Sequence, residues 1–105
     1  MDLVTDKKGE NIVLMDLRDV TLFTDFFVIA SANSDRQVNA ITDNTRDEIK
    51  KEFQLYPLHV EGRGENGWVL MDYGDVIVHL FLPEIRAYYD LEGHWADANV
   101  LLRIQ

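Results

Sequence analysis

The chain has 105 residues, no cysteine, 47% hydrophobic residues and 28% charged residues. This length supports one domain, since two would leave neither with an adequate core. Without cysteine there is no disulfide and no thiolate metal site. No apolar run approaches the roughly 20 residues of a membrane span, and no basic segment precedes an apolar stretch at the start. We therefore expect a cytoplasmic domain that does not enter a membrane.

Acidic residues outnumber basic ones by 19 to 10, which gives a net charge of −9. The imbalance is strongest in residues 56–97, which hold eight acids and two bases. Nucleic-acid binding requires Lys and Arg to neutralise phosphates, and the chain has no basic stripe to do so. We expect no direct DNA or RNA binding, whereas a basic protein surface would be attracted.

The first half of the chain predicts two strands and a long helix. Residues 2–10 are polar and are compatible with one or two helical turns, and residues 11–17 have the apolar body of a strand. The continuous apolar run 26–30 is typical of a strand covered on both faces. The clearest helix begins at Ser34, where a capping box starts, and its apolar stripe ends near Phe53.

The second half predicts a strand over 58–61, a glycine-rich turn over 62–67, and a hairpin of strands 68–73 and 76–82. Pro83 then begins a last helix. The order β-β-α-β-β-β-α predicts an α/β fold, with a mixed five-stranded sheet packed with helices.

The hairpin turn fixes which side chains share a face. Gly74 and Asp75 suit a two-residue type II′ turn, with glycine supplying the positive φ. One face is then aliphatic, and the other mixes aromatic, imidazole and carboxylate groups. The aliphatic face carries Val69, Met71, Val78 and Leu80, and the mixed face carries Trp68, Leu70, Asp72, Ile77, His79 and Phe81.

The mixed face has two interpretations. Five strands make a sheet roughly 24 Å wide, and two helices about 10 Å across cover roughly one face of it. Part of the Trp68 face should then meet solvent or a partner, and aromatics with a polar rim are typical of docking patches. Alternatively, Trp68 lies under the C-terminal helix or the tail as ordinary core. The sequence pattern leaves both open.

We expect no catalytic residue, metal or cofactor, and so no enzyme. Asp72 and Asp75 flank a turn, where acidic residues are common for turn formation alone. The three histidines lack metal-ligand spacing. The glycines of 62–67 match no phosphate-binding loop, because a strand follows them.

Several short motifs occur in order along the chain. They are DKK at 6–8, TDFFVIAS at 24–31, SDRQV at 34–38 with AI at 40–41, EG at 61–62, GW at 67–68, DYGDVIVH at 72–79, Arg86, YY at 88–89, LE at 91–92 and Trp95. Together they resemble the ribosomal silencing factor family, also called RsfS or Iojap, over about residues 6–98. The resemblance implies a nucleotidyltransferase-like architecture without that fold's catalytic signature. It also implies one domain over 1–98 followed by a tail at 99–105.

The resemblance implies a function as well. Members of the family bind large-subunit ribosomal protein fourteen and block joining of the small subunit, lowering translation when nutrients are short. The family's binding positions correspond here to Trp68, Tyr73 and Tyr89, although Tyr73 has the opposite strand parity to Trp68. The full protein-binding site that we expect comprises Trp68, Leu70, Asp72, Tyr73, Asp75, Ile77, His79 and Tyr89.

Three alternatives stay open. A nucleotide-binding or nucleotidyltransferase-like enzyme would need a Gly-Ser pair and clustered carboxylates, whereas residues 31–34 read Ser-Ala-Asn-Ser. A non-ribosomal protein-binding adaptor is a second possibility. The third concerns assembly: the family usually begins with a longer N-terminal helix, so a homodimer built with that helix stays in question.

Overall fold

The structure, a computed structural model, describes residues 10–104, and the helical turns expected before residue 10 lie outside the described residues. The elements are β1 (Glu10–Asp16), β2 (Phe26–Ser31), α2 (Asp35–Phe53), β3 (His59–Glu61), the 3₁₀ turn η1 (Gly64–Asn66), β4 (Trp68–Asp72), β5 (Val76–Phe81), α3 (Pro83–Tyr89), α4 (Leu91–His94) and β6 (Asn99–Ile104). The mixed α/β class is confirmed, and it is compatible with a nucleotidyltransferase-like architecture.

The sheet has six strands in the order β3-β4-β5-β2-β1-β6, one more than predicted. Among the strands of residues 10–104, β2 and β5 run parallel and the other neighbours are antiparallel. The added strand β6 lies within 99–105, the segment set apart as a tail on sequence grounds. Its residues are exposed and show no alternation of apolar and polar types, so the strand period is missing from the sequence.

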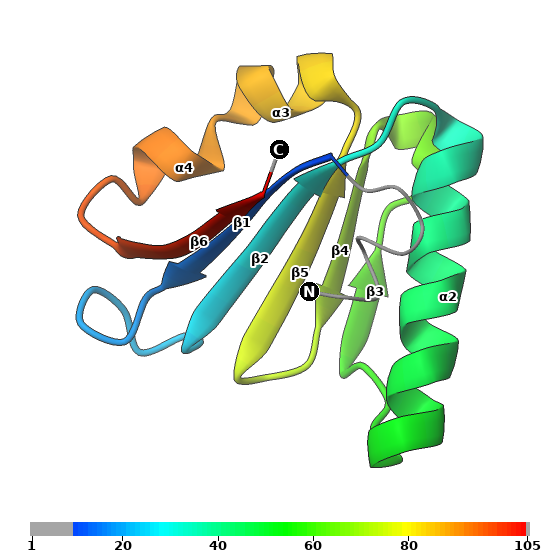
Figure 1. The fold of residues 1–105 in the computed structure, drawn as a ribbon, viewed down its shortest axis with the longest axis horizontal. Helices are drawn as coiled ribbons and strands as arrows, with labels where there is room; N and C mark the ends of the chain where they lie inside the picture. Colours follow the sequence, from blue (N-terminus) through cyan, green and yellow to red (C-terminus); the bar gives the residue numbers. More distant parts are fainter. Residues whose placement is uncertain (1–9, 105) are drawn as a thin grey trace.

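Helices lie on both faces of the sheet (Figure 1). The helix α2 packs Val38 and Ile41 against the aliphatic face. Ile85 of α3, Leu91 of α4 and Trp95 pack against the opposite face, which carries Phe81. The helical cover is therefore divided between the two faces, and the last helix lies on the Trp68 side, as one of the two interpretations of the mixed face held. The helix α3 begins directly after β5, and its apolar side chains return to the mixed face.

The helix α2 begins as predicted. The Ser34 side chain accepts a hydrogen bond from the Gln37 amide at 3.1 Å, and the Gln37 side chain accepts one from the Asn33 amide at 2.6 Å. The predicted apolar stripe ends early, because Phe53 is 64% exposed. Within residues 10–104, no helix is long and apolar enough to cross a membrane.

The predicted last helix is two short helices separated at Asp90. This residue has φ of +45°, a left-handed conformation that ends α3. Its carboxylate then accepts a hydrogen bond from the Gly93 amide at 3.1 Å and caps the start of α4. The chain therefore bends between Tyr89 and Leu91, and α4 follows the sheet toward β1 and β6 (Figure 1).

Candidate functional site

The β4–β5 hairpin has the predicted register. Its paired residues are Trp68 with Phe81, Leu70 with His79, and Asp72 with Ile77. Gly74 has φ of +88°, and the Tyr73 amide donates to the Val76 carbonyl at 2.9 Å across the two-residue turn. The mixed face therefore exists as the sequence predicted. Its part on β5 is covered, and its part beside β3 is open.

Trp68 lies half-buried in a cluster of rings. Its indole Nε1 donates a hydrogen bond to Nδ1 of His79 at 3.1 Å. Its ring stacks on Phe81, with ring centres 5.1 Å apart, and meets Tyr89 of α3 at 4.7 Å. The two interpretations of Trp68 both hold in part: α3 packs against the indole, yet the indole keeps an exposed portion.

His79 is a buried member of this cluster, with 3% of its surface exposed. Phe27 meets the imidazole edge-on, with ring centres 4.6 Å apart. Because Nδ1 accepts from Trp68, the hydrogen belongs on Nε2, which is buried without a hydrogen-bond partner. Burial lowers the pKa of His79 to about 4, so the ring is neutral at pH 7. His79 thus supports Trp68 from beneath and does not itself face solvent, contrary to its expected place on an exposed patch.

The mixed face is open toward β3. Exposure rises across the sheet from buried His79 on β5, through half-buried Leu70 and Asp72 on β4, to exposed His59 and Glu61 on β3. The helices α3 and α4 contribute their apolar side chains to the cluster around Phe27 and Phe81, which reaches Trp68 on β4 but includes no residue of β3. The expectation of an uncovered portion is met at this end.

Tyr73 lies on the other face of the sheet from Trp68. It packs against the cluster beneath α2, and its hydroxyl is buried without a hydrogen-bond partner. Burial raises the pKa of this hydroxyl, and the Arg46 charge opposes that rise. The opposite parity noted in the sequence is therefore real. Tyr73 and Trp68 cannot belong to one flat contact surface.

The two acidic residues of the hairpin differ in what holds them. An Asp72 carboxylate oxygen accepts a hydrogen bond from the Gly74 amide at 2.7 Å. Asp75 is exposed, and its backbone carbonyl accepts from the amides of Asp25 and Phe26 at 2.9 and 3.0 Å. In the part of the chain described, no three His, Asp or Glu side chains group as metal ligands.

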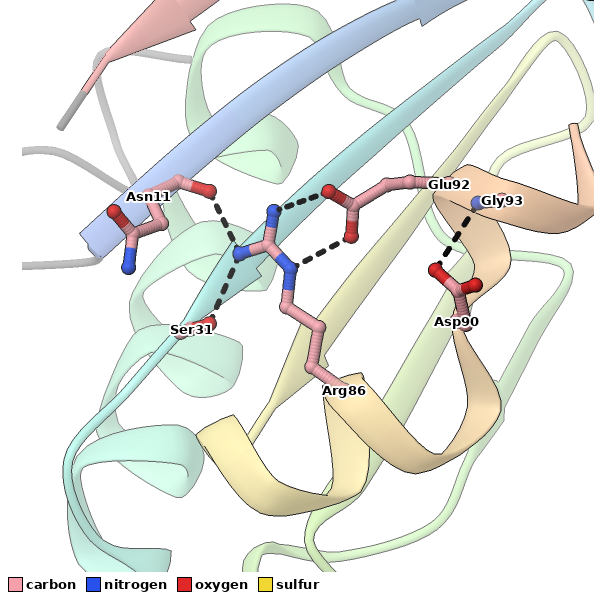
Figure 2. Close-up of polar contacts among 6 residues, drawn as sticks. All are labelled: Asn11, Ser31, Arg86, Asp90, Glu92 and Gly93. Carbon is pink, nitrogen blue, oxygen red and sulfur yellow. Dashed lines mark hydrogen bonds and ion pairs between the residues drawn. The ribbon is translucent and has the colours of Figure 1, made fainter. Parts of the chain in front are cut away.

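Arg86 of α3 connects four segments of the chain (Figure 2). Its Nε and Nη2 donate to the two carboxylate oxygens of Glu92 at 2.8 and 3.2 Å. Its Nη1 donates to the Asn11 carbonyl at 2.7 Å and to the Ser31 hydroxyl at 2.9 Å. Asn11 has φ of +49° at an irregularity of the β1–β2 pairing, where its carbonyl can turn toward Arg86.

These bonds hold α3 in place over the sheet. Tyr89 lies three residues after Arg86, so the segment that places Tyr89 against Trp68 is anchored by the same guanidinium. Arg86 and Glu92 both belong to the sequence motifs, but no spacing indicates the contact of Arg86 with Asn11, which is 75 residues away.

The fold and the rings around Trp68 define a small α/β domain whose mixed face carries aromatic side chains beside Asp72 and Glu61. The family described as "Ribosomal silencing factor during starvation" matches residues 1–105. A relative from Halalkalibacterium halodurans, named ribosomal silencing factor RsfS, is 40% identical over 93% of this chain and 83% of its own. The chain therefore belongs to the ribosomal silencing factor family, as the sequence motifs indicated.

Two further proteins are informative. A crystal structure from Chromobacterium violaceum superposes with a TM-score of 0.85 at 34% identity, covering 90% of this chain and 78% of that one. A mouse protein named "Mitochondrial assembly of ribosomal large subunit protein 1" is 29% identical, covering 90% of this chain and 42% of its own.

Proposed function

We propose that this protein binds large-subunit ribosomal protein fourteen and thereby keeps the small ribosomal subunit from joining, which lowers translation in the cytoplasm. Membership of the ribosomal silencing factor family supports this function. The name of the mouse relative, which refers to the large ribosomal subunit, supports the choice of subunit.

The exposed aromatic group beside Trp68 is the observation that carries the proposal. Tyr88 is 80% exposed and Tyr89 is 47% exposed, and Tyr89 lies against the half-buried indole. Aromatic side chains that are held firmly yet accessible dominate binding energies at protein interfaces. A standard interface uses about 800 Å² per partner, roughly one eighth of the 6563 Å² surface here.

The remaining expected site residues have different roles in this proposal. Leu70, Asp72 and Ile77 extend the contact surface from Trp68 along the hairpin. His79 acts by supporting Trp68, and Tyr73 and Asp75 act at the hairpin end by shaping the turn. Repression is steric in this scheme, so no bond is made or broken.

Charge should govern how fast the complex forms. Residues 56–97 hold eight acids and two bases, so a basic ribosomal protein is attracted over a distance. The acidic rim then mainly increases the association rate and makes it salt-dependent, while the aromatic side chains set the lifetime of the complex.

The test compares Trp68→Ala with Tyr56→Ala, a control that removes an exposed aromatic from the loop between α2 and β3. Binding to purified large subunits is measured by sedimentation, and subunit joining by sucrose gradients. We expect Trp68→Ala to lose more than about 2 kcal/mol of binding, or about thirtyfold, and to stop blocking subunit joining. Circular dichroism should show both variants folded. Unchanged affinity of a folded Trp68→Ala protein would remove Trp68 from the site.

A further inference from the structure

A hollow of about 180 Å³ lies beside Trp68 at the open end of the mixed face, lined by Glu61, Gly62, Trp68 and Leu70. We propose that this hollow is a subsite for one arginine or lysine side chain of the protein partner. The proposal rests on the proposed function, because it specifies the chemistry that the same face recognises.

The apolar wall of the hollow comes from β4. Trp68 and Leu70 are two residues apart on this strand, so both side chains point to the same face, and both are half-buried. The hydrocarbon stem of an arginine or lysine packs well on such a wall while its charged end stays near water. The indole adds an attraction of its own, since cations bind favourably over aromatic faces.

The charged wall comes from β3. Glu61 pairs in register with Leu70, so its carboxylate is on the same face as the indole. Glu61 is exposed, and no cation within residues 10–104 forms an ion pair with it. A carboxylate beside an apolar wall accepts hydrogen bonds from a guanidinium or ammonium group and repels an anion.

The backbone fixes the shape of the hollow. Gly62 has φ of +84°, and a Cβ there would collide with the Trp68 carbonyl oxygen. The close approach of these two backbones therefore depends on glycine. A site formed by backbone needs little ordering when a ligand enters, which favours binding.

Two larger cavities lack this chemistry. One, of about 420 Å³, is lined by both acidic and basic groups, and its Arg86 is already paired with Glu92. The other, of about 480 Å³ and on the α2 side, is lined by Arg46 and Arg63 together with acidic residues. The hollow beside Trp68 has a carboxylate and no basic side chain, so it selects a cation.

The test measures binding of Glu61 variants to purified large subunits. We expect Glu61→Gln to weaken binding by roughly three- to tenfold at low salt, with the difference shrinking at high salt. Glu61→Lys should weaken it further, because a like charge would meet the partner's cation. Glu52→Gln removes an exposed carboxylate from α2 and serves as the matched control, with affinity unchanged.

A second measurement separates this proposal from the proposed function. N-acetyl-arginine amide should shift the Trp68 indole resonance in NMR titrations of the wild-type protein, whereas the uncharged citrulline analogue should not. If Trp68→Ala weakens subunit binding and Glu61→Gln does not, the subsite is wrong and the function stands. If Trp68→Ala has no effect, the proposed function fails, and equal shifts with both amides would overturn the subsite independently.

Discussion

The indole of Trp68 and the imidazole of His79 share a 3.1 Å hydrogen bond diagonally across the β4–β5 ladder. The bond turns the polar edge of the indole into the protein. A partner therefore meets the hydrocarbon part of the ring, and this part suits apolar and cationic groups better than hydrogen-bond acceptors.

Replacing His79 tests whether this hydrogen bond orients Trp68. His79→Leu leaves the indole N–H without its acceptor, and we expect a loss of about 1–2 kcal/mol in the free energy of unfolding. The Trp68 indole resonance should move, and affinity for large subunits should fall. His79→Asn keeps an acceptor near the position of Nδ1 and should restore the resonance and much of the affinity. Equal behaviour of the two variants would show that packing alone orients Trp68.

Acid should destabilise the protein through His79. Its pKa is about 4 when folded, against an ordinary value of 6.5, because burial disfavours the charged ring. As pH falls from 6.5 to about 4, the unfolded chain takes up a proton that the folded chain does not. The free energy of unfolding should fall by up to about 3 kcal/mol over this range and gain no slope from His79 above it.

Urea unfolding at several pH values measures this slope. His79→Leu should lose the slope between pH 4 and 6.5, and His59→Gln, at an exposed histidine, should keep it. Parallel stability curves for His79→Leu and the wild type would assign the acid sensitivity to other groups.

Breaking the Arg86 connections should be costly. The Arg86 side chain is 12% exposed, and Arg86→Met leaves the Glu92 carboxylate without its cation. We expect a loss of about 3 kcal/mol in the free energy of unfolding, measured by urea denaturation. Arg86→Lys should recover only part of it, since an ammonium cannot reproduce the two-pronged contact. Arg18→Met, which removes a cation whose side chain is 59% exposed from the Arg18–Asp16 pair, is the control and should change stability less. Equal losses at the two sites would contradict this role of Arg86.

Two glycines with positive φ should respond differently to alanine. Gly62→Ala adds a collision with the Trp68 carbonyl to the cost of its backbone conformation, so we expect a loss of about 2 kcal/mol or more. Gly74→Ala meets only Leu58, at 3.7 Å, and should cost about 1 kcal/mol. Thermal unfolding compares the two variants. If Gly74→Ala lost as much stability as Gly62→Ala, the positive φ would set the cost, and the close approach of Gly62 to the Trp68 carbonyl would not.

Local chemistry explains what could be predicted from the sequence. The glycine turn fixed the β4–β5 register, and the period of two then placed Trp68 and His79 on one face. The capping residue Ser34 located the start of α2. The family motifs pointed correctly to the family, which no local pattern alone could have done.

Long-range packing determines the features that could not be predicted from the sequence. Nothing before Pro83 tells which face α3 will cover, and so the burial of His79 was unforeseen. The split at Asp90 depends on a left-handed residue that is not glycine. Arg86 reaches Asn11 only because the fold brings the two ends of the chain together.

The strand β1 lies between β2 and β6 in the sheet. One of its edges pairs with residues close to it in the sequence, and its other edge pairs with the last residues described. As the chain is synthesised, β1 can form a hairpin with β2 early, but its outer edge stays unpaired until β6 has left the exit tunnel. During that interval the nascent domain presents an open edge that another strand could join. The outer edge of β1 is therefore closed only after the chain through Ile104 has emerged.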